Sequence, residues 1–264
     1  MTTRTFLVHG LLAGLLAGVA AFVVAYTVGE PQVDRAIALE SAGATADHHH
    51  EDEAAASGSV SHSHSHDDAA ISRTTQSTLG LATGTLAIGV VLGGLTGLLA
   101  AVGLGRLGSL RPAASTGLVA LLGAVSFSVV PFLKYPATPP AVGSGETIDS
   151  RTALWFGFVT VSVLGVLAAV AVARWAARRW SGVPGTIAGA AAYVVVVTVA
   201  ALAFPKVDEL GGFPASILWD FRISSLLTLL AMWAVIGAAL TALVDRSWRR
   251  QAAVEAQRAY AAAL

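Results

Sequence analysis

Residues 6–28 read FLVHGLLAGLLAGVAAFVVAYTV, and this stretch decides the fold class. It holds one histidine, His9, and no lysine, arginine, aspartate or glutamate. A helix needs about 20 mostly apolar residues to cross the hydrocarbon core of a bilayer, and this stretch is long enough. A secretory signal has a shorter apolar core, of about 7–15 residues. We therefore predict a retained transmembrane helix.

Five further stretches have the same character, and none of them contains a charged residue. They are residues 79–104, 113–133, 153–173, 184–204 and 223–244. Hydrophobic residues make up 55% of the chain and charged residues 12%, about half the charged share of an ordinary soluble domain. Backbone groups in lipid must bond to one another within a helix or a closed barrel, and no alternating segments typical of a barrel occur. The sequence predicts an all-α bundle of about six transmembrane helices, a single integral domain over residues 1–264 in the plasma membrane.

Charge separates the two sides of this topology. An even number of spans puts both termini on the same side of the membrane. That side also holds ten of the sixteen basic residues and two of the sixteen acids, a net charge of +8. The other side carries six basic residues and fourteen acids, a net charge of −8. Lysine and arginine near the spans favour the cytoplasm, so we predict that both termini lie inside (N-in, C-in).

Two glycine series predict how the helices pack. Gly10, Gly14 and Gly18 recur every four residues in the first span, and Gly89, Gly93 and Gly97 do so in the second. Small residues at this spacing line one helix face and let two backbones approach closely. The alternative is the general enrichment of glycine in membrane helices.

Residues 29–78 form the long connection, which we expect to be an extracytoplasmic loop, rich in His, Asp and Glu and disordered until a cation binds. Two clusters hold six of the seven histidines of the chain. The candidate metal ligands of these clusters are His48, His49, His50, Glu51, Asp52, Glu53, His62, His64, His66, Asp67 and Asp68. Imidazole with carboxylate suits divalent ions such as Co²⁺, Ni²⁺ or Zn²⁺, whereas Cu⁺ prefers sulfur. The alternative is a solvated acidic linker whose histidines only buffer.

Several classes of function are excluded or disfavoured. The chain has no cysteine, so it has neither disulfides nor thiolate sites. It lacks the HExxH and GxSxG motifs of hydrolases and the P-loop of nucleotide-driven transport, so we expect no enzyme. Balanced charge gives no case for a nucleic-acid partner. We expect no permanently bound cofactor, a divalent cation as substrate, and the lipid bilayer and the metal ion as partners.

Three short motifs carry a family resemblance. They are GEPQVDRAI at residues 29–37, PFLKYPATPPAVG at residues 131–143 and FPASILWDFR at residues 213–222. In their order and setting they resemble the CbtA family of predicted cobalt transporter subunits, across nearly the full chain. The resemblance implies a membrane component for cobalt uptake linked to cobalamin supply. It also implies a small histidine-bearing partner subunit, CbtB.

Independently of the resemblance, these motifs lie where spans meet water, and proline and aromatic residues at that depth are usually structural anchors. A functional interpretation notes the carboxylates Glu30, Asp34 and Asp220, which we expect to pair with Lys134, Arg35 and Arg222 until a cation displaces the base. His9, the one titratable group inside a span, is a candidate exit-side ligand or a residue that bonds to a neighbouring helix. A polar path is predicted along Ser126, Ser128, Tyr193, Thr198, Ser224, Ser225 and Thr228.

The leading hypothesis is a subunit that transports a divalent metal, with the histidine-rich segment capturing the ion outside. The alternative is a membrane protein that binds metal as a sensor or scaffold without transporting it.

Overall fold

The computed structural model describes residues 1–51, 72–140, 142–180 and 182–263, and these residues form helices and connecting loops without any strand. Six of the helices are long and apolar enough to cross a membrane. The predicted class, an all-α bundle of six membrane helices, is therefore confirmed.

The first transmembrane helix continues far beyond the apolar stretch. α1 (Thr3–Val24) passes through the π-helical turn η1 (Ala25–Gly29) into α2 (Glu30–Glu51) without a break. Ala36 on α2 is fully buried, and α2 packs against the last helix, α9. Residues 30–51, which the sequence placed in a long loop, are thus helical in the structure. The alanine-rich sequence of α2 favours a helix, and contact with α9 stabilises the part of α2 next to the bundle.

The second and third spans return across the bundle. The second comprises α3 (Arg73–Thr75), the π-helical η3 (Gln76–Gly80) and α4 (Leu81–Gly103). Ser72 begins it as an N-cap, because its side chain accepts a hydrogen bond from Thr75 N. The third comprises α5 (Pro112–Gly123), the π-helical η4 (Ala124–Val129) and α6 (Val130–Lys134).

The last three spans are simpler. A 3₁₀ turn, η5 (Gly145–Thr147), leads into α7 (Ile148–Arg179), and α8 (Gly182–Ala203) returns. α9 (Ala215–Ala262) is the longest helix, at 48 residues.

Two of the π-helical turns have a cause in the sequence. η1 ends two residues before Pro31, and η4 ends two residues before Pro131. Proline has no N–H and its ring collides with the carbonyl four residues earlier, so a helix that continues through it must widen or bend. A π-helical turn accommodates this strain, so that α1 continues into α2 and α5 continues into α6.

α1 and α4 pack backbone to backbone through the two glycine series. A Cβ atom added to Gly89 would lie 2.5 Å from Gly14 O and 2.8 Å from Gly18 Cα, closer than real side chains come. Gly10, Gly93 and Gly97 meet the opposite backbone in the same way. The predicted role of these glycines in close packing is confirmed.

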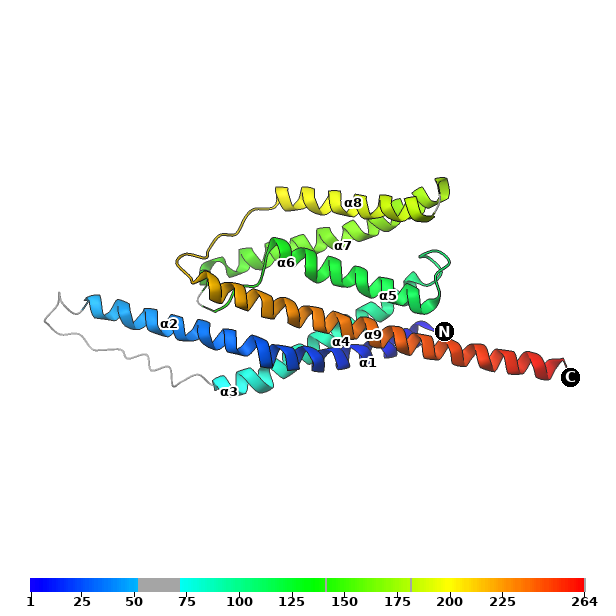
Figure 1. The fold of residues 1–264 in the computed structure, drawn as a ribbon, viewed down its shortest axis with the longest axis horizontal. Helices are drawn as coiled ribbons and strands as arrows, with labels where there is room; N and C mark the ends of the chain where they lie inside the picture. Colours follow the sequence, from blue (N-terminus) through cyan, green and yellow to red (C-terminus); the bar gives the residue numbers. More distant parts are fainter. Residues whose placement is uncertain (52–71, 141, 181, 264) are drawn as a thin grey trace.

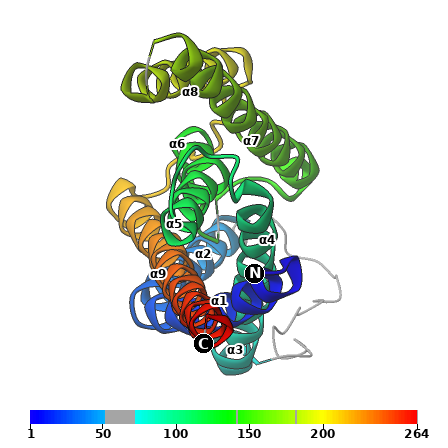
Figure 2. The same ribbon diagram turned by 90° about the vertical axis from the view of Figure 1, so that its right-hand side faces the viewer.

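The helices form two groups, as Figures 1 and 2 show. α1, α4, α5 and α9 pack against one another, whereas α7 and α8 form a hairpin beside them, in which α8 packs chiefly on α7. The hairpin meets the main group at η4 and α6, where Phe127 and Trp155 make an edge-to-face contact with ring centroids 5.9 Å apart. Apolar side chains such as Leu12, Leu164 and Val195 are exposed around the bundle, as lipid-facing residues are.

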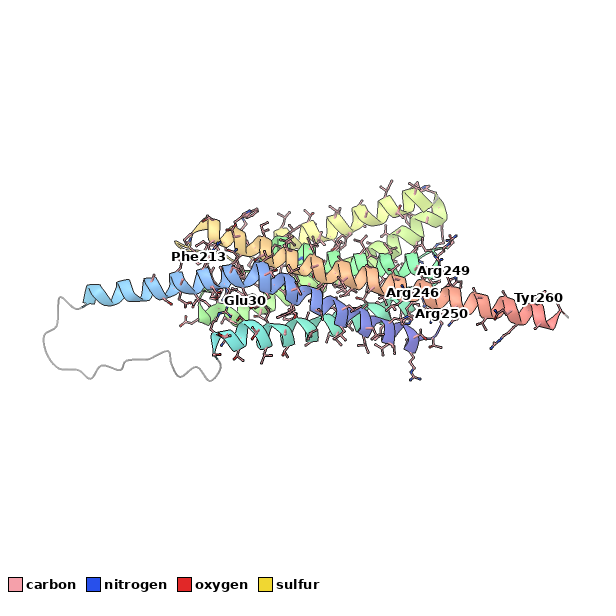
Figure 3. The ribbon with its side chains drawn as sticks, turned by 60° about the horizontal axis from the view of Figure 1, so that its bottom comes forward. Glu30, Phe213, Arg246, Arg249, Arg250 and Tyr260 are labelled. Carbon is pink, nitrogen blue, oxygen red and sulfur yellow. The ribbon has the colours of Figure 1, made fainter. Side chains whose placement is uncertain are left out.

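The two ends of the bundle carry opposite charge. Both termini, the connection at residues 104–111, the end of α7 and the start of α8 lie at one end, which we call the basic end (Figure 1). The projecting part of α2, residues 135–140 and 142–144 and the connection at residues 204–214 lie at the other, the acidic end. Figure 3 shows Glu30 and Phe213 toward the acidic end, and Arg246, Arg249 and Arg250 toward the basic end.

Candidate functional site

A cavity of about 730 Å³ opens at the acidic end. Its wall comes from η1 and the start of α2, from residues 132–138 and Val142, from the start of α7, from residues 207–210 and from the first half of α9. Each of the three sequence motifs therefore contributes to it, although they are far apart in the chain. The sequence predicts that the motifs lie at the same membrane face but does not predict that they enclose one space.

Three ion pairs join the candidate carboxylates beside the cavity to arginines. Arg73 bonds through Nη2 to Glu30 Oε2 and to Asp34 Oδ1, the latter at 3.0 Å. Arg35 Nη1 lies 3.8 Å from Asp220 Oδ2, and both of these side chains are more than half exposed. Exposed pairs of this kind contribute little to stability, whereas the Glu30 side chain is only 14% exposed. Arg73 is thus the main counter-charge of the candidate carboxylates.

The predicted pairing of these carboxylates is partly correct. Arg35 pairs with Asp220 as expected, but neither Lys134 nor Arg222 pairs with a carboxylate among the described residues. Arg73 was missed, although one signal was present: it is the single basic residue between the histidine-rich tract and the second span.

Lys134 and Tyr135 donate hydrogen bonds to carbonyl groups at the end of α8. Lys134 Nζ donates to Ala201 O at 2.7 Å and to Phe204 O at 3.0 Å, and Tyr135 Oη donates to Pro205 O at 2.8 Å. The last carbonyls of a helix lack partners within it, and a cation at that end also complements the helix dipole. Burial raises the pKa of the Tyr135 phenol above its ordinary value.

A second network holds the loop above α7. Glu209 Oε2 accepts from Thr147 Oγ1 at 2.9 Å and from Ser144 N at 3.2 Å, and it lies 3.6 Å from Arg151 Nε. Gly143 covers this pair with a φ of +94°, a conformation that favours glycine. Arg151 and Glu209 were not predicted as partners, because nothing in their spacing brings them together.

The second and third motifs touch directly. Arg222, on α9, donates from Nε to Ala137 O at 3.4 Å.

A family model described as "Probable cobalt transporter subunit (CbtA)" matches residues 3–245, nearly the whole chain. The chain belongs to the CbtA family. Searches among curated proteins and among solved structures found no match.

The family membership gives these motifs a setting. This CbtA-family protein is a multi-pass membrane protein, and its description as a subunit implies a complex with a partner. Its three motifs gather around one cavity at the acidic end.

The histidine-rich clusters of the CbtA-family chain lie largely beyond what the structure describes. The backbone of residues 48–51 forms the last turn of α2. The other candidate ligands, Asp52, Glu53, His62, His64, His66, Asp67 and Asp68, lie outside the described residues. Where side chains are described, no three His, Asp or Glu groups come together as a metal site.

His9 lies toward the basic end, on the face of α1 that meets α9. Its Nε2 is 3.4 Å from Ser247 Oγ, and its Nδ1 is buried without a hydrogen-bond partner. This contact matches the expectation that His9 bonds to a neighbouring helix.

The hydroxyl groups expected to line one path divide among different places. Ser224, Ser225 and Thr228 line the cavity, whereas Ser128 Oγ accepts from Trp233 Nε1 at 2.7 Å. Tyr193 bonds to Ser162 at 2.8 Å, between α7 and α8. These residues therefore do not form one line through the described part of the bundle.

Proposed function

We propose that this CbtA-family protein takes up cobalt, as a divalent cation, across the plasma membrane, and that this uptake supplies cobalamin synthesis. The observation that carries the proposal is the grouping of Glu30, Asp34 and Asp220, which belong to two of the three motifs, at the end to which the histidine-rich segment is attached. The family description supports cobalt as the cargo.

The orientation follows from charge. Arginines such as Arg106, Arg178 and Arg246 belong to the basic end, which would lie in the cytoplasm by the positive-inside tendency. The acidic end and the histidine-rich segment would then face outward, where the ion arrives.

Capture by the histidine-rich segment is the first step of the proposal. His48 to His50 and His62, His64 and His66 offer imidazole nitrogens beside carboxylates, a set that suits borderline divalent ions. A net charge of −8 on this side raises the local concentration of cations further.

The carboxylates at the edge of the cavity form the next station. The side chains of Asp34 and Asp220 are each more than half exposed, so water and ions reach them although they pair with Arg73 and Arg35. An arriving cation would compete with the arginine for the carboxylate. Glu30, more deeply placed and held by Arg73, would be the last of the three to exchange.

A partner subunit completes the proposal. Transport of a bare ion needs several ligands at once, and the described residues bring no three such groups together. A small histidine-bearing membrane subunit of the CbtB type would supply the missing ligands.

The test is uptake of radioactive cobalt by cells with and without the protein. Changing the six loop histidines to alanine should weaken uptake at low cobalt and change it little near saturation, because local concentration affects only the filling of the site. The matched control changes Ser61, Ser63 and Ser65 of the same segment to alanine. Asp34→Asn and Asp220→Asn should instead lower the maximal rate.

Uptake is normalised to the amount of protein in the membrane. Cobalt bound by the protein without any accumulation in cells, with the CbtB-type partner present, would favour the sensor or scaffold alternative. A loop variant that loses maximal rate while both aspartate variants keep theirs would reverse the assigned roles.

A further inference from the structure

The charges that line the cavity do not match a bare cation. Three cationic side chains, Lys134, Arg151 and Arg222, and two acidic ones, Glu30 and Glu209, form part of its wall. Both acids already have a partner, since Glu30 is held by Arg73 and Glu209 by Arg151. Within the described part of the chain, Lys134 and Arg222 form no ion pair. The lining therefore keeps an excess of positive charge.

These two cations also keep donors in reserve. A guanidinium has five N–H donors, and the structure gives Arg222 one hydrogen bond, from Nε to Ala137 O. An ammonium has three, and Lys134 uses two of them on Ala201 O and Phe204 O. Arginine presents its donors as a planar fork that fits the two oxygens of a carboxylate or phosphate.

Most of the rest of the wall is apolar, although five serine and threonine residues also line it. The apolar part includes Leu81, Phe132, Trp155, Phe221 and Leu229. The volume of about 730 Å³ lies in the range of roughly 300–1,000 Å³ that is typical of sites for small organic molecules. It is much larger than the coordination sphere of one divalent ion, whose ligand atoms lie about 2 Å from the metal.

We infer that this cavity binds an organic anion: a carboxylate or phosphate with an apolar body, its charged group held by Arg222 and Lys134 and its body against the apolar part of the wall. Two sources share this chemistry, an anionic lipid of the bilayer and a soluble organic anion from outside. The inference goes beyond cobalt uptake and does not depend on it, because it concerns Lys134 and Arg222 rather than the carboxylates Glu30, Asp34 and Asp220.

The test uses the full-length protein in nanodiscs of neutral phosphatidylcholine and three matched probes. The probes are para-nitrobenzoate, para-nitrobenzyl alcohol and para-nitrobenzylamine, which share a nitroaromatic body and differ in charge. Nitroaromatic groups quench tryptophan fluorescence, and Trp155 lines the cavity. Saturable quenching by the benzoate is expected, with binding roughly tenfold tighter than that of the alcohol, the ratio that a charge-assisted hydrogen bond of about 1.5 kcal/mol produces. The quenching should largely vanish in Trp155→Phe.

Variants of Arg222 test whether this residue binds the charged group of the benzoate. Arg222→Gln should abolish the preference for the benzoate, Arg222→Lys should retain part of it, and Arg250→Gln, at the basic end, should leave it intact. Adding phosphatidylglycerol to the nanodisc distinguishes the sources: competition with the benzoate identifies a lipid, and its absence identifies a soluble anion. The inference is overturned if the amine binds as tightly as the benzoate, a comparison that needs only the unmodified protein. It is overturned equally if folded Arg222→Gln retains the full preference.

Discussion

The guanidinium of Arg73 is bonded to the carboxylate of Glu30, although the two residues are 43 positions apart in the chain. Glu30 begins α2, which leads into the histidine-rich segment, and Arg73 begins the second span directly after it. The bond therefore joins the start of α2 to the start of the second span at the acidic end. Because Glu30 also lines the cavity, this ion pair lies beside it.

Replacing Arg73 by glutamine should destabilise the protein measurably. Glu30 would keep a mostly buried carboxylate without its counter-charge, which costs about 1–3 kcal/mol of unfolding free energy. Denaturant unfolding of the purified protein measures this change. Arg35→Gln is the control, expected to cost about 0.5 kcal/mol because the Arg35–Asp220 pair is exposed. Equal losses in the two variants would contradict the difference in burial.

Gly89→Ala should separate α1 from α4. The new methyl group would lie 2.5 Å from Gly14 O, and a helix backbone cannot yield as a side chain does. Overpacking of this kind costs about 1–3 kcal/mol. Gly84→Ala, on the same helix with open space around it, should be neutral or slightly stabilising. Thermal unfolding in detergent compares them, and a stable Gly89→Ala would show that the two helices are not in backbone contact.

Gly143→Ala should disturb the loop over the cavity. The residue has a φ of +94°, and an added Cβ would lie 2.8 Å from both Arg151 Cζ and Glu209 Oε2. The positive φ alone costs an alanine about 1–3 kcal/mol. Gly145→Ala, two residues on and in open space, is the matched control. Protease sensitivity of the loop and unfolding free energy are the measurements, and two indistinguishable variants would refute the role of Gly143.

Metal binding by the histidine-rich segment should weaken in acid. Free imidazole has a pKa of about 6.5, and below that value protons occupy the nitrogen that the metal needs. Affinity for Co²⁺, Ni²⁺ or Zn²⁺ should therefore be highest at pH values well above the imidazole pKa and should fall as the pH drops through it. Calorimetric titration of a peptide covering residues 40–70 tests this. Equal affinity near pH 5 and near pH 7.5 would exclude histidine as the main ligand.

Both termini should lie in the cytoplasm. A reporter that is active only in the cytoplasm, fused to the C-terminus, should be active, and one that requires export should be silent. The reason is the ten basic residues at that end against six at the other. The opposite pattern would invert the proposed direction of transport.

The six spans, the opposite charges of the two ends and the glycine contact of α1 with α4 could all be predicted from the sequence. Each depends on a local property, namely an apolar run of sufficient length, the charge of a connecting segment, or small residues four positions apart on one helix face. The helix over residues 30–51 was missed because its polar composition resembles that of a solvated loop, and its lower part is supported by contact with α9, which lies far along the chain.

Only the tertiary structure decided which charges meet. Lys134 binds carbonyl groups at the end of α8 rather than a carboxylate. Arg73 is the residue that pairs with Glu30, although the sequence allowed other basic residues equally. Likewise, three motifs separated by most of the chain enclose one cavity because the C-terminal ends of α1 and α6 and the N-terminal end of α9 lie at the same end of the bundle. Hydropathy places a residue at a depth in the membrane, but the partner it meets there depends on which helices become neighbours. That order is set by the packing of side chains from distant segments.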